Sequence, residues 1–239
     1  KVAGSVNHDE VKKVSLTNNY QIDAKKLINT VNENTKLLFL CSPNNPTGNL
    51  LNKEAVIEVV KKFNGIVVLD EAYIDFAPGK SLLRELANHE NLVVLQTFSK
   101  AWGMAGIRLG MAFAAPEIIS VLNKIKYPYN LNILTQEKAL ELTESKERIV
   151  KWIKLIIAER EKMAELLKGF PFVVQVFPSD SNFLLVKMYD AKGIYHYLVE
   201  KGIVVRDRSK VHLCEESLRI TIGTSVENEQ LLKALNDLI

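Results

Sequence analysis

The residues most able to do chemistry lie in the stretch TFSKAWGMAGIRLG, residues 97–110. Lys100 follows an apolar run, NLVVLQ, that is typical of a buried strand. Desolvation lowers the pKa of a lysine, and a neutral amine can attack a carbonyl carbon to form a Schiff base. The hydroxyls of Thr97 and Ser99 and the guanidinium of Arg108 suit a phosphate held beside that amine. Taken alone, the stretch also fits a solvated lysine in a strand–helix loop.

Two further apolar runs end in polar residues that could join Lys100. Asn45 lies in the loop SPNNPTG after the run TKLLFLC, and Asp70 and Tyr73 lie in DEAY after GIVVL. In sheets of parallel strands, ligands bind beyond the carboxyl ends of the strands. We therefore expect Asn45, Asp70, Tyr73 and Lys100 to meet at one edge of a sheet.

This set of groups matches what pyridoxal phosphate requires. A lysine can carry the cofactor's aldehyde, and a carboxylate such as Asp70 can keep the pyridine nitrogen protonated, so that the ring accepts electrons. An amide and a phenol can donate to the ring oxygen. The simpler alternatives are that Asp70 caps a strand end beside a solvated Glu71, and that Tyr73 only packs.

The elements that must position these groups alternate between strand and helix. The pattern predicts strands at 11–16, 35–41, 65–69, 91–96 and 109–114, and helices at 23–31, 52–62, 81–87 and from 116. Apolar strands of this kind predict an α/β three-layer sandwich with a mostly parallel sheet covered on both faces.

The character of the chain changes in its last third. Residues 134–167 form a helical pattern with a break at 143–145. After it we expect short strands at 172–177, 182–187, 202–205 and 218–222, and helices at 191–200 and 226–238. We therefore predict a large domain over residues 1–143, and a connecting helix with a smaller α+β domain over residues 144–239.

Composition excludes several classes of protein. The 239 residues carry a formal net charge of +3, which is spread along the chain and gives no nucleic-acid pattern. No apolar segment approaches the roughly 20 residues that a membrane span needs. Cys41 and Cys214 lie far apart without metal-type spacing, so we expect reduced thiols in a cytoplasmic protein and no metal site.

Four motifs, SPNNPTG, LDEAYIDF, TFSKAWGMAGIRLG and LRITIGT, occur in the order and spacing of one family. From about Val11 onward the chain resembles the fold-type I pyridoxal-phosphate aminotransferases, and among them the histidinol-phosphate aminotransferases most. The resemblance implies transfer of an amino group between L-histidinol phosphate and 2-oxoglutarate in histidine biosynthesis. The products would be imidazole acetol phosphate and L-glutamate, and the enzyme would be a homodimer.

The resemblance also implies roles for the cofactor-binding residues. Lys100 would be the Schiff-base lysine and proton shuttle, and Asp70 the partner of the pyridine nitrogen. Asn45 and Tyr73 would donate to the ring oxygen. The cofactor's phosphate would be held by Thr97, Ser99 and Arg108.

Arginines near the end of the chain would bind the substrate. Arg219, in LRIT, is implied as the clamp on the α-carboxylate, a task that suits a bidentate guanidinium, with Asn45 beside it. Arg206, in IVVRDRS, matches the arginine that faces the substrate's phosphate. Arg208 lies on the same alternation face and is either an assistant or solvated.

The same comparison of motifs bears on the length of the protein and on alternative functions. The family's N-terminal portion is not in this sequence, so we expect the chain to be the back part of a longer protein. The cofactor residues would also serve a decarboxylase of a phosphorylated amino acid, a carbon–sulfur lyase or an aromatic aminotransferase, because the pocket selects which bond breaks. A non-catalytic protein of the same fold is a further alternative, which the presence of Asp70, Lys100 and Arg108 disfavours.

Overall fold

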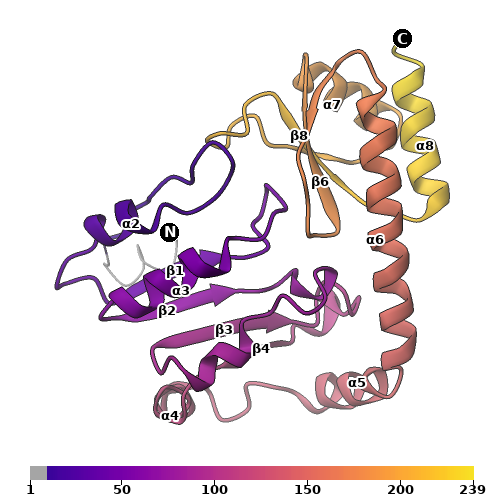
Figure 1. Cartoon of the computed structure of the whole chain (residues 1–239). Helices are drawn as coiled ribbons and strands as arrows, with labels where there is room; N and C mark the ends of the chain where they lie inside the picture. The colour runs from indigo at the N-terminus through magenta and orange to yellow at the C-terminus, as the bar shows by residue number, and fades with distance from the viewer. Residues whose placement is uncertain (1–9) are drawn as a thin grey trace.

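A computed structural model of the chain describes residues 10–239 and shows two separate four-stranded sheets (Figure 1). The first consists of β1 (Leu37–Cys41), β2 (Ile66–Asp70), β3 (Leu92–Thr97) and β4 (Gly110–Phe113), in that order. The pairs β1–β2 and β2–β3 are parallel, and β4 runs antiparallel to β3. The predicted mostly parallel sheet is confirmed.

Two helices cover one face of the first sheet, α2 (Ala24–Thr30) and α3 (Lys53–Lys62). Both begin where the sequence predicts, because the side chains of Asp23 and Asn52 accept hydrogen bonds from the amides of the first helical turn. Buried apolar side chains of α3, such as Val59, pack on Val67 and other core-facing residues of the strands.

The other face of the sheet is less covered in the described part of the chain. Phe39 of β1 is 68% exposed and Leu37 is 52% exposed. Phe39 lies opposite Val68 in the register, so both point to this face. Asp70 is two residues beyond Val68, so its carboxylate also lies on this side.

Three helices lead away from the first sheet. They are α4 (Pro116–Ile125), α5 (Ile133–Thr143) and α6 (Lys146–Lys168). The break between α5 and α6 falls at residues 144–145, as predicted. Figure 1 shows α6 running from α5, near the first sheet, to the second sheet, where it lies beside α8. Within the described part of the chain, no helix combines the length and apolar character that a membrane span requires.

The second sheet is entirely antiparallel. Its strands are β5 (Val173–Val176), β6 (Phe183–Met188), β8 (Ser217–Thr221) and β7 (Arg206–Asp207), in that spatial order. Its outer face, with Leu184 and Val186, packs against α6, α7 (Ala191–Glu200) and α8 (Ser225–Asn236). The two sheets have separate cores, while the proposed division at residue 143 remains a prediction.

Three element predictions are wrong. Residues 11–16 form no strand, because they lie largely exposed and pair with no described strand. Residues 202–205 form no strand: a turn at Lys201 and Gly202 follows α7, with Gly202 at a φ of +76°, and β7 begins only at Arg206. The helix predicted at 81–87 is a short 3₁₀ helix, η2 (Leu83–Ala87), which has no side-chain cap of the kind that begins α2.

Candidate active site at the strand ends

The carboxyl ends of β1, β2 and β3 meet at one edge of the first sheet. Cys41 lies opposite Asp70, and Asp70 lies opposite Leu95, two residues before Thr97. Burial, with a smaller contribution from the negative charge of Asp70, raises the pKa of the Cys41 thiol to about 11. The Asp70 carboxylate therefore lies near the Cys41 thiol at the edge of the sheet.

Asp70 is half-buried at the end of β2. Its Oδ1 accepts a hydrogen bond of 2.9 Å from the backbone N–H of Ala72, which turns the chain toward Tyr73. Asp70 therefore caps the strand end, which was one of the two interpretations of this residue. Its second carboxylate oxygen has no described partner, so Asp70 could also bind a pyridine nitrogen. Asp70 is thus held by the backbone.

Asn45, Tyr73 and Lys100 come from three different loops and lie together. The amide Nδ2 of Asn45 lies 3.5 Å from the Tyr73 hydroxyl. The Lys100 Nζ lies 5.1 Å from the centre of the Tyr73 ring, within the range of a cation–π contact. Tyr73 itself is buried, with 7% of its surface exposed.

Lys100 is exposed, which differs from the desolvated lysine expected from the sequence. The turn that carries it follows β3, and among residues 10–239 only the Tyr73 ring makes a recorded contact with the ammonium. Most apolar residues of β3 are buried in the sheet core, but this burial ends before Lys100.

The predicted phosphate ligands are brought together only in part. Thr97 Oγ1 lies 3.0 Å from Ser99 Oγ and also accepts a 3.0 Å hydrogen bond from the Ser99 N–H. Arg108 adopts a left-handed backbone conformation with a φ of +57°. Its guanidinium donates to the carbonyl of Ala105 at 2.8 Å, so in this arrangement it bonds its own loop.

Arg219 reaches the site from the second sheet. Its Nη1 donates a 2.8 Å hydrogen bond to Oδ1 of Asn45. The guanidinium lies 4.9 Å from the ring centre of Phe183, which in turn packs edge-on against Tyr73 at 5.2 Å. The Nε of Arg219 is buried and has no partner among the described residues. An unfilled donor of this kind suits an anionic ligand.

Two other arginines flank Arg219. Arg206 lies opposite Arg219 in the register and is exposed, and Arg208 follows on the same face with a buried Nε that has no described partner. Burial lowers the pKa of Arg219; Tyr73 acts in the opposite direction, and the charges of Arg208 and Arg206 lower it further. No described carboxylate forms an ion pair with any of the three. The face of the second sheet that carries these three arginines therefore favours the binding of an anion.

Sequence reasoning placed Glu71 wrongly. It was expected to be solvated, but only 2% of its surface is exposed. Its carboxylate accepts from Ser81 Oγ at 2.6 Å, the Leu82 N–H at 2.7 Å and Gln96 Nε2 at 2.9 Å. Successive strand residues face opposite sides of a sheet, so Glu71 points to the covered face while Asp70 points to the other. That alternation was available from the sequence.

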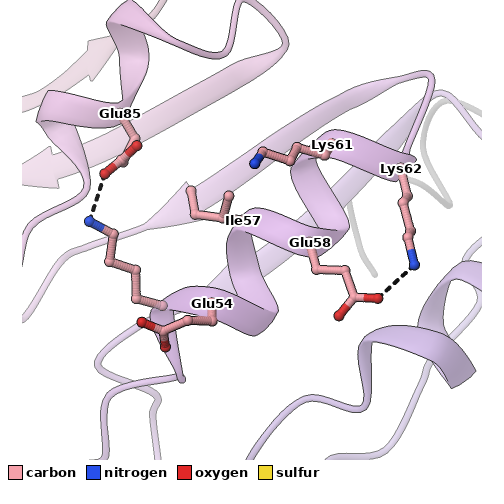
Figure 2. A pocket seen from close by; sticks show the side chains of 7 residues that line it. Glu54, Ile57, Glu58, Lys61, Lys62 and Glu85 are labelled. Carbon is pink, nitrogen blue, oxygen red and sulfur yellow. Dashed lines mark hydrogen bonds and ion pairs between the residues drawn. The ribbon is translucent and has the colours of Figure 1, made fainter.

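A hollow on the exposed side of α3 lies apart from these residues (Figure 2). Its lining is charged, with Lys53 paired to Glu85 at 2.6 Å and Lys62 paired to Glu58 at 2.7 Å. Ion pairs of this kind are typical of a solvated surface. In the part of the chain that the structure describes, no cluster of His, Cys, Asp and Glu could hold a metal ion.

A mostly parallel sheet with a lysine, a carboxylate and an amide at its strand ends, joined by an arginine from a second sheet, is an arrangement shared by a large class of enzymes. Residues 5–235 match the family model "Aminotransferase class I and II". The chain belongs to this family.

Three individual proteins show what the chain is similar to within this family and its fold. The chain is 54% identical to a histidinol-phosphate aminotransferase of Parabacteroides distasonis, over 99% of this chain and 69% of that protein. The crystal structure of the histidinol-phosphate aminotransferase from Clostridium acetobutylicum superposes with a TM-score of 0.92 at 26% identity, over 99% of this chain and 73% of that one. A decarboxylase from Sulfurospirillum multivorans superposes with a TM-score of 0.83 at 29% identity, over 96% and 70%.

Proposed function

We propose that this protein is a pyridoxal-phosphate-dependent aminotransferase acting on L-histidinol phosphate and 2-oxoglutarate. The products are imidazole acetol phosphate and L-glutamate, in histidine biosynthesis. The observation that carries the proposal is the 54% identity to a histidinol-phosphate aminotransferase over nearly the whole chain. The site geometry supports it, because a chain of contacts runs from Arg219 to Asn45, from Asn45 to Tyr73 and from Tyr73 to Lys100.

The donor set fits pyridoxal phosphate. When bound, this cofactor supplies an aldehyde and an electron-accepting pyridine ring. Lys100 offers the amine for the aldehyde and Asp70 the carboxylate for the ring nitrogen. The amide of Asn45 and the phenol of Tyr73 donate to the ring oxygen. The phosphate ligands in this proposal are Thr97, Ser99 and Arg108.

The chain's own residues then perform binding and proton transfer. Lys100 Nζ would take the proton from the substrate's Cα and deliver it to the carbon that carries the cofactor's aldehyde, as general base and general acid. Arg219 binds the α-carboxylate of glutamate and of 2-oxoglutarate through its fork of donors, with Asn45 holding one of its nitrogens. Arg206 binds the substrate's phosphate from the neighbouring strand.

The deciding experiment is a substrate panel on the full-length protein with added cofactor. We expect glutamate and a keto product from L-histidinol phosphate and 2-oxoglutarate, without release of carbon dioxide. The panel also includes a phosphorylated amino acid that bears a carboxylate, and release of carbon dioxide from it would indicate the decarboxylase alternative. Borohydride treatment should abolish the visible absorption of the bound cofactor, and mass spectrometry should locate the added mass on Lys100. Attachment at another lysine would contradict the site.

We also propose that the enzyme works as a homodimer. Apolar side chains with large exposed fractions gather on α4, α5 and the segment between them, and large exposed apolar patches mark interfaces. This apolar patch consists of Val121, Ile125, Tyr127, Tyr129, Ile133 and Leu134.

Cytoplasmic location is part of the same proposal. Cys41 and Cys214 are both free thiols, and Cys214 is buried. Free thiols persist in a reducing compartment, where disulfides are rare.

A further inference from the structure

The loop that carries Asn45 is fastened to the second sheet. The carbonyl of Gly48 accepts a 2.7 Å hydrogen bond from the Asp180 N–H and a 3.1 Å bond from Ser181 Oγ. In return, Asp180 Oδ2 accepts a 2.8 Å bond from the Leu50 N–H. We call these contacts, between residues 48–50 and residues 179–181, the clasp. They join segments about 130 residues apart in the chain.

The clasp is tightly packed. Ser181 is fully buried, and Gly48 has a φ of +85°. A Cβ on Gly48 would lie 2.5 Å from Ser179 Oγ, so only glycine allows this approach. Arg160 of α6, which is 9% exposed, donates a 2.8 Å hydrogen bond to the Ser181 carbonyl from behind. The connecting helix thus holds the second half of the clasp.

The position of Gly48 determines the position of Asn45. The loop is closed on itself, since the Gly48 N–H donates to the Asn44 carbonyl at 2.7 Å and the Asn44 N–H donates to the Asn49 carbonyl at 2.8 Å. Asn45 therefore moves with the clasp as one short rigid unit.

The other half of the clasp leads directly to Arg219. Two residues after Ser181 the chain enters β6 at Phe183, and β6 pairs with β8 so that Leu185 lies opposite Arg219. The clasp therefore spans the two elements whose side chains meet in the 2.8 Å bond between Asn45 and Arg219.

We infer that Asp180 is a positioning residue for the substrate carboxylate site. By accepting from Leu50 it fixes the loop of Asn45 relative to β8, so Arg219 is already oriented before substrate arrives. The inference rests on the proposed function, because it assigns Arg219 to the substrate. Preorganisation of this kind lowers the entropic cost of binding.

The test compares Asp180→Ala with Asp180→Asn in the full-length holoenzyme. Alanine removes the acceptor for the Leu50 N–H, whereas the asparagine carbonyl oxygen retains it. We expect Asp180→Ala to raise the KM for glutamate and for 2-oxoglutarate about five- to tenfold, the factor that one intramolecular hydrogen bond is worth. The affinity for pyridoxal phosphate should change less than these KM values, since Asn45 is the only proposed cofactor ligand on the clasped loop and Asp70, Thr97 and Lys100 lie outside it. Asp180→Asn should restore KM to within about twofold of the wild type.

A second readout is independent of catalysis. Amide hydrogen exchange at residues 44–50 should accelerate in Asp180→Ala and not in Asp180→Asn. The matched control is Asp23→Ala, which removes a 2.9 Å carboxylate bond to the Lys26 N–H on α2 and should change neither KM nor exchange at 44–50. If Asp180→Ala fails to fold, Ser181→Ala removes only the bond to Gly48 and should give the same changes in weaker form.

Unchanged KM and exchange in Asp180→Ala would overturn the inference, as would equal damage in Asp180→Asn. A wild-type protein that shows no transamination would refute the proposed function instead, and exchange at 44–50 would still decide whether Asp180 orders the loop.

Discussion

Neighbouring acidic side chains after β2 have very different surroundings. Asp70 is half-buried and bonded to the Ala72 N–H, while Glu71 is buried with three donors. Asp75 follows in η1 (Ile74–Phe76) and is half-buried with no described hydrogen bond. A carboxylate is stable in the interior only when donors compensate for lost water, and Asp75 lacks them.

Asp75 should make stability depend on pH. Burial raises its pKa, and the charge of Glu71 raises it further. A carboxyl group with a raised folded-state pKa contributes stability that is complete below its unfolded pKa of about 3.9 and is lost as pH rises through the folded value. We expect Asp75→Asn to gain stability relative to the wild type between pH 4 and pH 7, by about 2 °C in Tm at pH 7. Thermal unfolding across this range tests it, with Asp23→Asn as the control. Parallel curves for wild type and Asp75→Asn would contradict the prediction.

Arg206 should matter for the phosphorylated substrate. Charge-assisted hydrogen bonds to phosphate are strong, so Arg206→Leu should raise the KM for the amino phosphate about 10- to 100-fold. Affinity for pyridoxal phosphate should change far less, because Arg206 lies on the second sheet beside Arg219. Steady-state kinetics and cofactor titration separate the two effects, with Arg208→Leu as the comparison. An unchanged KM would remove Arg206 from the site.

Single elements of this chain begin and end at recognisable residues. Asp23 and Asn52 cap α2 and α3, and Pro116 occupies the start of α4. Helix α8 begins with a capping box, in which Thr224 accepts from the Glu227 N–H and the Glu227 carboxylate accepts from the Thr224 N–H. This hydrogen bond to the Thr224 N–H and the bond to its hydroxyl lower the pKa of Glu227.

The capping box gives a prediction for α8. Thr224→Ala leaves the Glu227 N–H without its side-chain acceptor and should lower Tm by about 2–4 °C. Thermal unfolding followed by circular dichroism measures the change. Glu229→Ala, at an exposed position of the same helix, should leave Tm unchanged within about 1 °C if only the cap matters. A similar loss in both variants would count against the cap.

Several contacts among the described residues join the two sheets. Helix α6 runs between the sheets (Figure 1), the clasp fastens the Asn45 loop, and a small apolar cluster packs Tyr73 and Phe76 against Phe183. Ile153 and Ile156 of α6 pack on the same cluster. The candidate site lies where these contacts converge, so its geometry depends on both sheets.

The apolar patch on α4 and α5 should form the dimer contact. Figure 1 shows these helices at the opposite end of the molecule from α7 and α8. Ile125→Glu combined with Leu134→Glu places charge on side chains that are 73% and 72% exposed and should shift the protein from dimer to monomer in analytical ultracentrifugation. Val226→Glu, on α8 with 64% exposed, is the matched control and should remain dimeric. A dimer that survives the double substitution would place the interface elsewhere.

Much of this arrangement follows from the sequence alone. Apolar runs identified β1 to β4, the capping residues fixed the starts of α2 and α3, and the strand-end rule brought Asn45, Tyr73 and Lys100 to one edge. These features are local, because a run of apolar residues or a cap depends on neighbours within a few positions.

Only the tertiary structure decided the rest. Residues 11–16 resemble a strand but find no partner among the described residues, and Arg108 bonds Ala105 in its own loop. The clasp and the bond between Asn45 and Arg219 join residues 130 to 174 positions apart. Contacts at such separations depend on how two sheets pack, and no short stretch of sequence encodes that distance.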